Sequence, residues 1–307
     1  MLSGMPIKFG ASPLNWWFGL PIHKDLIPTA DDILREMAET GYAGTELGGA
    51  MPSDPATLSP LLEKYNLELA GGWFGAELLS QPLEDQKKKF TDFMMDLKRM
   101  GSDTVVTAES THVPIGLPYS DQVFKDVLTE NLFPYKLPFL RDREWKTLAD
   151  GLEAFWNLTQ QQDMQLAFHP HMQLLVQDLW QIERLIEVAP FLTFCLDTGH
   201  MYFAGDDPAK VIEKYIDKTV HLHLKSVRPD IIARARREPM TWMWSKIDGV
   251  FTVPGDGGID FLPIFETLKE NDWKGWMVVE AEQNPLVANP YLYSGLAREY
   301  LKDVTGI

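Results

Sequence analysis

Eight short apolar runs alternate with longer amphipathic stretches along almost the whole chain, and this alternation restricts the fold more than any other feature of the sequence. The runs have the length of buried strands, and the stretches between them have the length and periodicity of helices. We expect strands at residues 7–12, 44–48, 68–74, 103–109, 165–171, 192–200, 219–227 and 275–283. Strict alternation of strands and helices predicts parallel strands joined by right-handed crossovers.

The stretches between the runs carry the end signals of helices. Thr29 precedes one of them as a capping residue, and Gly41 follows it. We expect the main helices at about 30–40, 54–65, 84–100, 144–162, 176–188, 208–216, 261–270 and 290–302. Eight strand-helix units in one chain most simply close into an α/β fold of the (β/α)8 TIM barrel type.

A doubly wound open sheet is the alternative architecture, but no G-x-G-x-x-G turn follows the first apolar run. The chain shows no linker, low-complexity tract or shift in composition, so we expect one domain over residues 1–307. Two connections, 110–143 and 228–260, exceed the usual loop length. Both follow predicted strands at the end of the barrel where reaction sites lie, so we expect them to cover a pocket. Contacts between copies in a homo-oligomer are the alternative.

Charge and cysteine content exclude several classes of protein. Asp and Glu total 44 against 28 Lys and Arg, a formal charge of −16, which opposes binding to nucleic acid or to anionic membranes. No apolar run is long enough to span a membrane, and the first residues lack a secretory signal pattern. Cys195 is the single cysteine, so an intramolecular disulfide and a cysteine-based zinc site are excluded. We expect a cytoplasmic protein that acts on a small molecule.

Acidic, imidazole and lysine side chains follow most of the predicted strands. The set is Glu46, Glu109, His169, His171, Asp197, His200, His221, His223, Lys225, Glu280 and Glu282. Five of the seven histidines belong to it. Because the carboxyl ends of parallel strands meet at one end of a barrel, these groups predict a site for a divalent metal of intermediate hardness.

Alternation within strands ranks some of these residues. His221 and His223 lie two apart and share a face, and His223, nearer the end of its strand, is the better ligand candidate. The apolar run 277–279 leads directly into Glu280, whose carboxylate must then be paired or metal-bound. Glu46 and Glu109 suit a salt bridge as well as a pocket role, and any single histidine here suits a structural role.

Several segments resemble known motifs. Residues 195–208 (CLDTGHMYFAGDDP) and 221–230 (HLHLKSVRPD) are similar to the sixth- and seventh-strand motifs of the xylose-isomerase-like and apurinic-endonuclease-like TIM barrels. Residues 249–290 resemble the inosose dehydratase family more closely, above all in the stretches TVPGD and VEAEQ. GYAGTELG and FHPHM fit that family as well, and the resemblance extends from about residue 7 to residue 301.

The superfamily resemblance implies one divalent ion, bound by a Glu after strand five, an Asp after strand six, a His after strand seven and a Glu after strand eight. The last three positions map onto Asp197, His223 and Glu280. The fifth run ends AFHPHMQLL and offers no acid, so His171 or Gln173 replaces the Glu, or three protein ligands bind the ion with more water. The resemblance implies Mn²⁺ or Co²⁺, with Zn²⁺ or Mg²⁺ as alternatives, and it alone suggests glutathione.

The family resemblance implies a metal-dependent hydro-lyase that dehydrates 2-keto-myo-inositol (inosose), by removing the proton beside the carbonyl and then losing hydroxide from the next carbon. Imidazole suits both proton transfers near neutral pH. We expect His169 and His200 as the proton-transfer pair, Glu46 as an alternative base and Lys225 as a cation that neutralises enolate charge. The expected substrate contacts are Glu109, Arg228, Trp73 and Trp16.

Other functions remain open from the residues alone. A ketose epimerase or isomerase, or a lyase acting on keto-glycosides, would use the same metal-stabilised enolate. An abasic-site nuclease would need a basic face, which the charge of −16 opposes. A sugar-binding barrel without catalysis is the alternative outside the enzymes.

Overall fold

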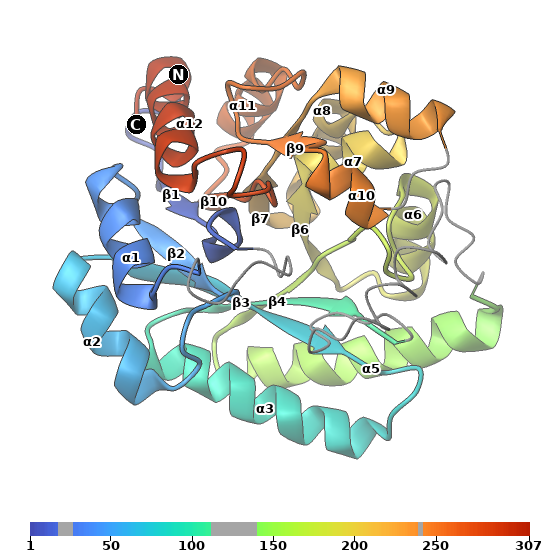
Figure 1. Cartoon of the computed structure of the whole chain (residues 1–307). Coiled ribbons are helices and arrows are strands. Elements are labelled where there is room, and N and C mark those ends of the chain that lie inside the picture. The colour runs from blue at the N-terminus through green and yellow to red at the C-terminus, as the bar shows by residue number, and fades with distance from the viewer. Residues whose placement is uncertain (18–26, 112–139, 239–241) are drawn as a thin grey trace.

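The computed structural model of the chain describes residues 1–17, 27–111, 140–238 and 242–307. Parallel strands form a closed barrel in the order β1-β10-β7-β6-β5-β4-β3-β2, and helices surround it (Figure 1). The barrel strands are β1 (Ile7–Ala11), β2 (Gly44–Leu47), β3 (Glu68–Ala76), β4 (Thr104–Glu109), β5 (Gln165–Phe168), β6 (Thr193–Asp197), β7 (Thr219–Leu224) and β10 (Gly275–Val279). Each predicted run overlaps one of these strands, which confirms the predicted TIM barrel.

Helices follow the strands as the periodicity predicts. They include α1 (Ala30–Glu39), α2 (Pro55–Tyr65), α3 (Leu83–Arg99), α5 (Asp142–Gln160), α6 (Leu179–Val188), α8 (Pro208–Lys214), α11 (Leu262–Glu270) and α12 (Pro290–Thr305). The Thr29 hydroxyl accepts a hydrogen bond from Asp32 N at 3.2 Å and so caps α1. Gly41 follows that helix with φ +87°, a conformation that suits glycine.

Several strands end earlier than their apolar runs, and in three of them the residues around the strand end explain it. β5 stops at Phe168, and Pro170, which has no N–H to donate, separates His169 from His171. β6 stops at Asp197, because the carboxylate of that residue accepts a hydrogen bond from His200 N at 2.9 Å and caps the short helix α7 (Thr198–Ala204). The seventh run divides into β7 and β8 (Ser226–Val227), which pairs with β9 (Phe251–Thr252) in a separate antiparallel ribbon.

The connection at residues 228–260, here called the inserted segment, has secondary structure of its own. It contains α9 (Pro229–Arg237), α10 (Trp242–Ile247) and β9. Arg228 holds the segment together: its guanidinium donates to Gly249 O at 2.6 Å, to Phe251 O at 3.1 Å and to Asp256 Oδ2 at 2.8 Å. Most of the other long connection, residues 112–139, lies outside the described residues.

The apolar core fills the space between barrel and helices. Phe90 and Phe155 stack there with their ring centroids 4.1 Å apart, and Cys195 is buried as expected for a small apolar side chain. The two ends of the chain meet beside α12, where the Met1 amino group donates to Thr305 O at 2.7 Å (Figure 1).

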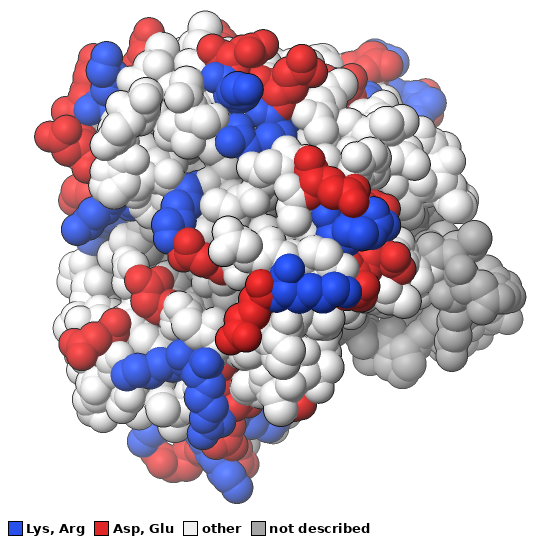
Figure 2. Space-filling view, turned by 90° about the vertical axis from the view of Figure 1, so that its left-hand side faces the viewer, with Lys and Arg blue, Asp and Glu red and all other residues white. Residues whose placement is uncertain are grey.

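The surface carries both signs of charge. Figure 2 shows one face of the molecule, on which basic and acidic side chains are interspersed rather than gathered into a continuous basic track. Among the residues that the structure describes, no helix has both the length and the apolar composition needed to cross a membrane.

Candidate active site

Four residues at the ends of four different barrel strands form a buried group. Ligand atoms of His169, Asp197, His223 and Glu280 all lie within 4.8 Å of one another. His223 Nδ1 is 3.3 Å from Glu280 Oε2 and 3.7 Å from Asp197 Oδ2. The structure therefore brings together the three ligands expected after strands six, seven and eight. The strand-five residue that joins them is His169.

His171, the expected fourth ligand, belongs to a neighbouring group with His169 and His200. The ring centroids of His171 and His200 are 4.2 Å apart. His169 N donates to Thr107 O at 2.7 Å, which continues the β4–β5 pairing by one residue and keeps this imidazole at the strand end. Pro170 follows the end of the strand, and His171 after it lies beside His200.

The four grouped residues fit a divalent cation. Among the described residues, His223 Nδ1 and Asp197 Oδ2 are buried and make no hydrogen bond, although Lys225 Nζ lies 2.9 Å from the Asp197 oxygen. Buried polar atoms without a hydrogen bond indicate that an additional partner binds them. Two imidazoles and two carboxylates are a donor set for Zn²⁺, Co²⁺ or Mn²⁺. The chain's own residues can thus hold a divalent metal ion.

Glu46 orients the histidines of β7. Its Oε1 atom lies 2.8 Å from His221 Nε2 and 3.1 Å from His223 Nε2. Burial opposes ionisation of Glu46, but contacts with His223 and His221 outweigh it and lower the pKa of the carboxyl to about 2. The contact with His223 Nε2 leaves Nδ1 facing Asp197 and Glu280, the arrangement by which a second carboxylate orients a metal-binding imidazole. A carboxylate of such low pKa is a weak base.

Lys225 is completely buried among carboxylates. Its Nζ atom is 2.8 Å from Glu282 Oε2, 2.9 Å from Asp197 Oδ2 and 3.0 Å from Glu280 Oε2. Burial opposes the charge, but these three carboxylates outweigh it and raise the pKa of Lys225 above its usual value. The ammonium nitrogen also lies 3.0 Å from His200 Nε2. Lys225 is therefore a permanent cation beside the ligand group.

Three histidines in the site are neutral at physiological pH. Burial lowers the pKa of His169 and His200 well below the usual range and that of His171 to about 4. His169 Nδ1 lies 2.9 Å from Cys195 O, and because a carbonyl oxygen only accepts, this nitrogen carries the proton. His169 Nε2 then keeps a lone pair for a metal ion.

The four residues expected to contact the substrate lie in different places in the structure. Trp73 lies beside the site, with ring centroids 5.7 Å from His169 and 5.8 Å from His171. Trp16 donates to Glu36 Oε2 at 2.6 Å and so anchors α1. Glu109 accepts from Leu78 N at 2.9 Å and from Thr111 N at 3.0 Å. Arg228 binds the inserted segment.

The sequence predicts no role for two residues at the site. It marks Glu282 as a strand-end acid, but the alternation with Glu280 does not reveal its partners. Lys246, from α10, places its Nζ atom 2.6 Å from Glu282 Oε1 and is buried. Nothing near Lys246 in the sequence marks it, because its partner lies 36 residues away.

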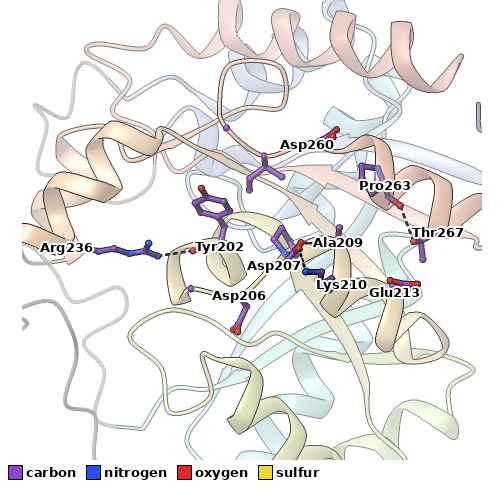
Figure 3. Close-up of a pocket in the computed structure, with 14 residues that line it drawn as sticks. Tyr202, Asp206, Asp207, Ala209, Lys210, Glu213, Arg236, Asp260, Pro263 and Thr267 are labelled. Carbon is purple, nitrogen blue, oxygen red and sulfur yellow. Dashed lines mark hydrogen bonds and ion pairs between the residues drawn. The ribbon is translucent and has the colours of Figure 1, made fainter.

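A cavity of about 740 Å³ lies outside the barrel (Figure 3). Its lining comes from α7, α8, α9 and α11 and includes Tyr202, Asp206, Lys210, Arg236 and Asp260. Arg236 is directed toward the Tyr202 carbonyl oxygen, at 3.4 Å (Figure 3). The predicted site residues do not line this cavity.

Comparisons with known proteins agree with the barrel fold. Residues 34–303 match the family model described as xylose isomerase-like TIM barrel. The chain is 35% identical over 315 residues to an inosose dehydratase of Clostridium beijerinckii, with 100% of both chains covered. It is 36% identical over 303 residues to an inosose dehydratase of Clostridium tetani, with 98% of both covered.

Among solved structures, the IOLI protein with a binding zinc atom superposes with a TM-score of 0.66 at 15% identity, over 97% of this chain and 98% of that one. That likeness shows a shared fold. The family model and the full-length identities go further, and on their strength this chain belongs to the inosose dehydratase family of xylose isomerase-like TIM barrels.

Proposed function

We propose that this chain is a metal-dependent hydro-lyase that dehydrates 2-keto-myo-inositol in inositol catabolism. The observation that carries the proposal is the buried group of His169, Asp197, His223 and Glu280, in a chain whose full-length relatives are named inosose dehydratases. An epimerase or isomerase on the same barrel is not favoured, because those full-length relatives carry a dehydratase name.

Charge balance supports a divalent ion. Six carboxyl and ammonium groups are buried at the site: Glu46, Asp197, Glu280, Glu282, Lys225 and Lys246. When all are ionised, the carboxylates outnumber the ammonium groups by two charges, and one divalent cation neutralises them. Burial opposes a proton on His223, but Cys195, Glu46 and Glu280 raise the pKa of that imidazole well above its usual range. A metal ion competes with that proton for the same negative surroundings.

We assign His169 to the ligand group, together with Asp197, His223 and Glu280. When bound, Mn²⁺ or Co²⁺ supplies Lewis acidity that stabilises negative charge on the carbonyl oxygen of the substrate. Glu46 holds His223 in the orientation that ligation needs. Of the expected proton-transfer pair, His200 keeps its role and His169 takes the role of ligand.

Proton transfer falls to the residues beside the ligand group. His171 and His200 are neutral imidazoles in contact with each other, and a neutral imidazole accepts the proton from the carbon beside the carbonyl. Lys225 stays protonated between three carboxylates and donates a hydrogen bond to the departing hydroxyl oxygen. The imidazolium formed in the first step returns its proton to that oxygen, so that water leaves and the imidazole is neutral again. Trp73 supplies a flat apolar surface for the ring of the substrate.

Chelation tests the proposal. Protein stripped of metal is assayed by NMR with 2-keto-myo-inositol, before and after addition of Mn²⁺ or Co²⁺. We expect loss of activity on stripping, recovery on addition and a dehydrated product. Full activity in protein shown by elemental analysis to be metal-free would contradict the metal requirement. An epimerised ketone as the product would establish the alternative enzyme.

A further inference from the structure

A second set of buried charges connects the inserted segment to the ligand group. Glu282 lies at the centre of this set and uses both of its carboxylate oxygens. Oε1 is 2.6 Å from Lys246 Nζ, which comes from α10 of the inserted segment. Oε2 is 2.8 Å from Lys225 Nζ and 3.0 Å from His200 Nε2. All four side chains are buried, so water does not screen these contacts.

Glu282 differs from Glu280 in what it touches. Among the described residues, Glu280 belongs to a group able to hold a metal ion, and Glu282 belongs to none. The Glu282 backbone has φ +42°, in the left-handed region that non-glycine residues rarely adopt. Such a conformation persists only where the surroundings hold it, and residues of this kind gather at functional sites. The contacts to Lys246, Lys225 and His200 are what hold the side chain here.

The position of Lys225 depends on Glu282. The Lys225 ammonium lies between the ligand carboxylates of Asp197 and Glu280 on one side and Glu282 on the other. Without the charge of Glu282, attraction toward the two ligand carboxylates is unopposed, and the ammonium moves away from His200. Loss of the Glu282 carboxylate would thus displace the Lys225 ammonium and also remove a contact of the His200 imidazole.

The inserted segment also supplies an apolar wall at this point. The Phe251 ring, from β9, has its centroid 5.2 Å from Lys225 Nζ and 5.7 Å from the His200 ring. An aromatic face beside the ammonium adds a cation–π contact and keeps water away. Phe251 therefore lies directly beside Lys225 and His200, and Lys246 of the same segment reaches them through Glu282.

We propose that Glu282 and Lys246 are positioning residues for this site. Glu282 sets the places of Lys225 and His200, and Lys246 holds Glu282 from the inserted segment, so that this segment completes the active site. The inference rests on the proposed function for the roles of Lys225 and His200.

Kinetics of three variants test the inference. Glu282→Gln and Lys246→Met should each lower kcat by about 10- to 100-fold, the range expected when a catalytic group is misplaced by about 1 Å. KM should stay within about threefold, and metal content should not change, since neither residue belongs to the ligand group. Lys246→Arg restores the positive charge and should recover most of the lost kcat, which a merely structural lysine would not predict.

Asp248→Asn is the matched control. Asp248 lies two residues beyond Lys246 and pairs with Arg234 on the exposed side of the same segment. It should leave kcat, KM and metal content unchanged. Equal losses in Asp248→Asn and Lys246→Met would show that the segment matters only through its general stability, and would overturn the inference.

A readout without turnover separates this inference from the proposed function. In protein labelled with ¹⁵N-histidine, the His200 imidazole resonances, assigned with His200→Gln, should shift in Glu282→Gln and Lys246→Met but not in Asp248→Asn. If the wild type does not dehydrate 2-keto-myo-inositol but the two variants still show these shifts, the positioning contact is supported and the proposed function is refuted. Unchanged resonances and unchanged kcat would refute the positioning role. If Glu282→Gln fails to fold, Lys246→Met and Lys246→Arg decide the question.

Discussion

Gly199 shows how one small residue determines where a buried charge can lie. A Cβ atom at Gly199 would be 2.5 Å from Lys225 Cγ and 2.8 Å from Lys225 Cδ, far inside contact distance. The Lys225 main chain is also fixed, because its N donates to Thr198 Oγ1 at 3.0 Å and its O accepts from the same hydroxyl at 2.7 Å. Gly199 is thus needed because any side chain there would overlap the aliphatic part of the Lys225 side chain.

Gly199→Ala should displace Lys225 and lower kcat by more than about tenfold. It should also reduce the free energy of unfolding by about 1–3 kcal/mol, since the added methyl overlaps the middle of the stem rather than its flexible end. Steady-state kinetics and thermal unfolding measure the two effects. Gly295→Ala, at a helical glycine whose nearest neighbour atom is 3.8 Å away, is the control and should be neutral or stabilising. Normal kcat in Gly199→Ala would contradict the argument.

At the scale of the element, the end of β5 separates two histidines that look equivalent in the sequence. His169 continues the strand pairing and groups with Asp197, His223 and Glu280, whereas His171 follows Pro170 and contacts His200. Alternation places residues 169 and 171 on the same face of an uninterrupted strand. The strand stops at Phe168, so the alternation of side chains along a strand no longer predicts the directions of His169 and His171.

His169→Gln should weaken binding of Mn²⁺ or Co²⁺ by at least about tenfold, because it removes a ligand. His171→Gln should leave the affinity within about threefold and lower kcat instead, because it removes a proton acceptor. Calorimetric titration gives the metal affinities, and NMR assays give kcat. The opposite pattern, with affinity lost in His171→Gln alone, would return His171 to the ligand group as expected from the sequence.

At the scale of the whole molecule, the chain is strongly acidic, and inside its barrel the carboxyl groups of Glu46, Asp197, Glu280 and Glu282 outnumber the two buried ammonium groups. Exposed ion pairs such as Lys64 with Asp31, 2.6 Å apart, are screened by solvent and contribute little to stability. The buried cluster is different, because uncompensated charge there destabilises the folded state. A bound divalent ion should therefore stabilise the fold as a whole.

Adding Mn²⁺ or Co²⁺ to stripped protein should raise the Tm. At a free metal concentration about 100 times the Kd, the stabilisation amounts to about 2.7 kcal/mol. Differential scanning calorimetry over a metal titration measures the effect. Ca²⁺ is the matched control and should stabilise less, because it prefers oxygen ligands and His169 and His223 offer nitrogen. A Tm independent of Mn²⁺ and Co²⁺ would contradict the charge argument.

The sequence by itself determined the barrel and the end of the barrel at which the strand-end residues meet. Both follow from periodicity, since parallel strands of a closed barrel must bring their carboxyl ends together whatever the packing details. The proposal of Asp197, His223 and Glu280 as metal ligands came from the resemblance of their motifs to the superfamily, and the structure places the three side chains in one group. Only the tertiary structure places His169 rather than His171 in the group of Asp197, His223 and Glu280, brings Lys246 to Glu282, and uses Trp16 and Glu109 as anchors. Those contacts join residues far apart in the sequence, 36 positions in the case of Lys246 and Glu282, and a local pattern carries no record of which side chain a residue will meet once the chain has folded.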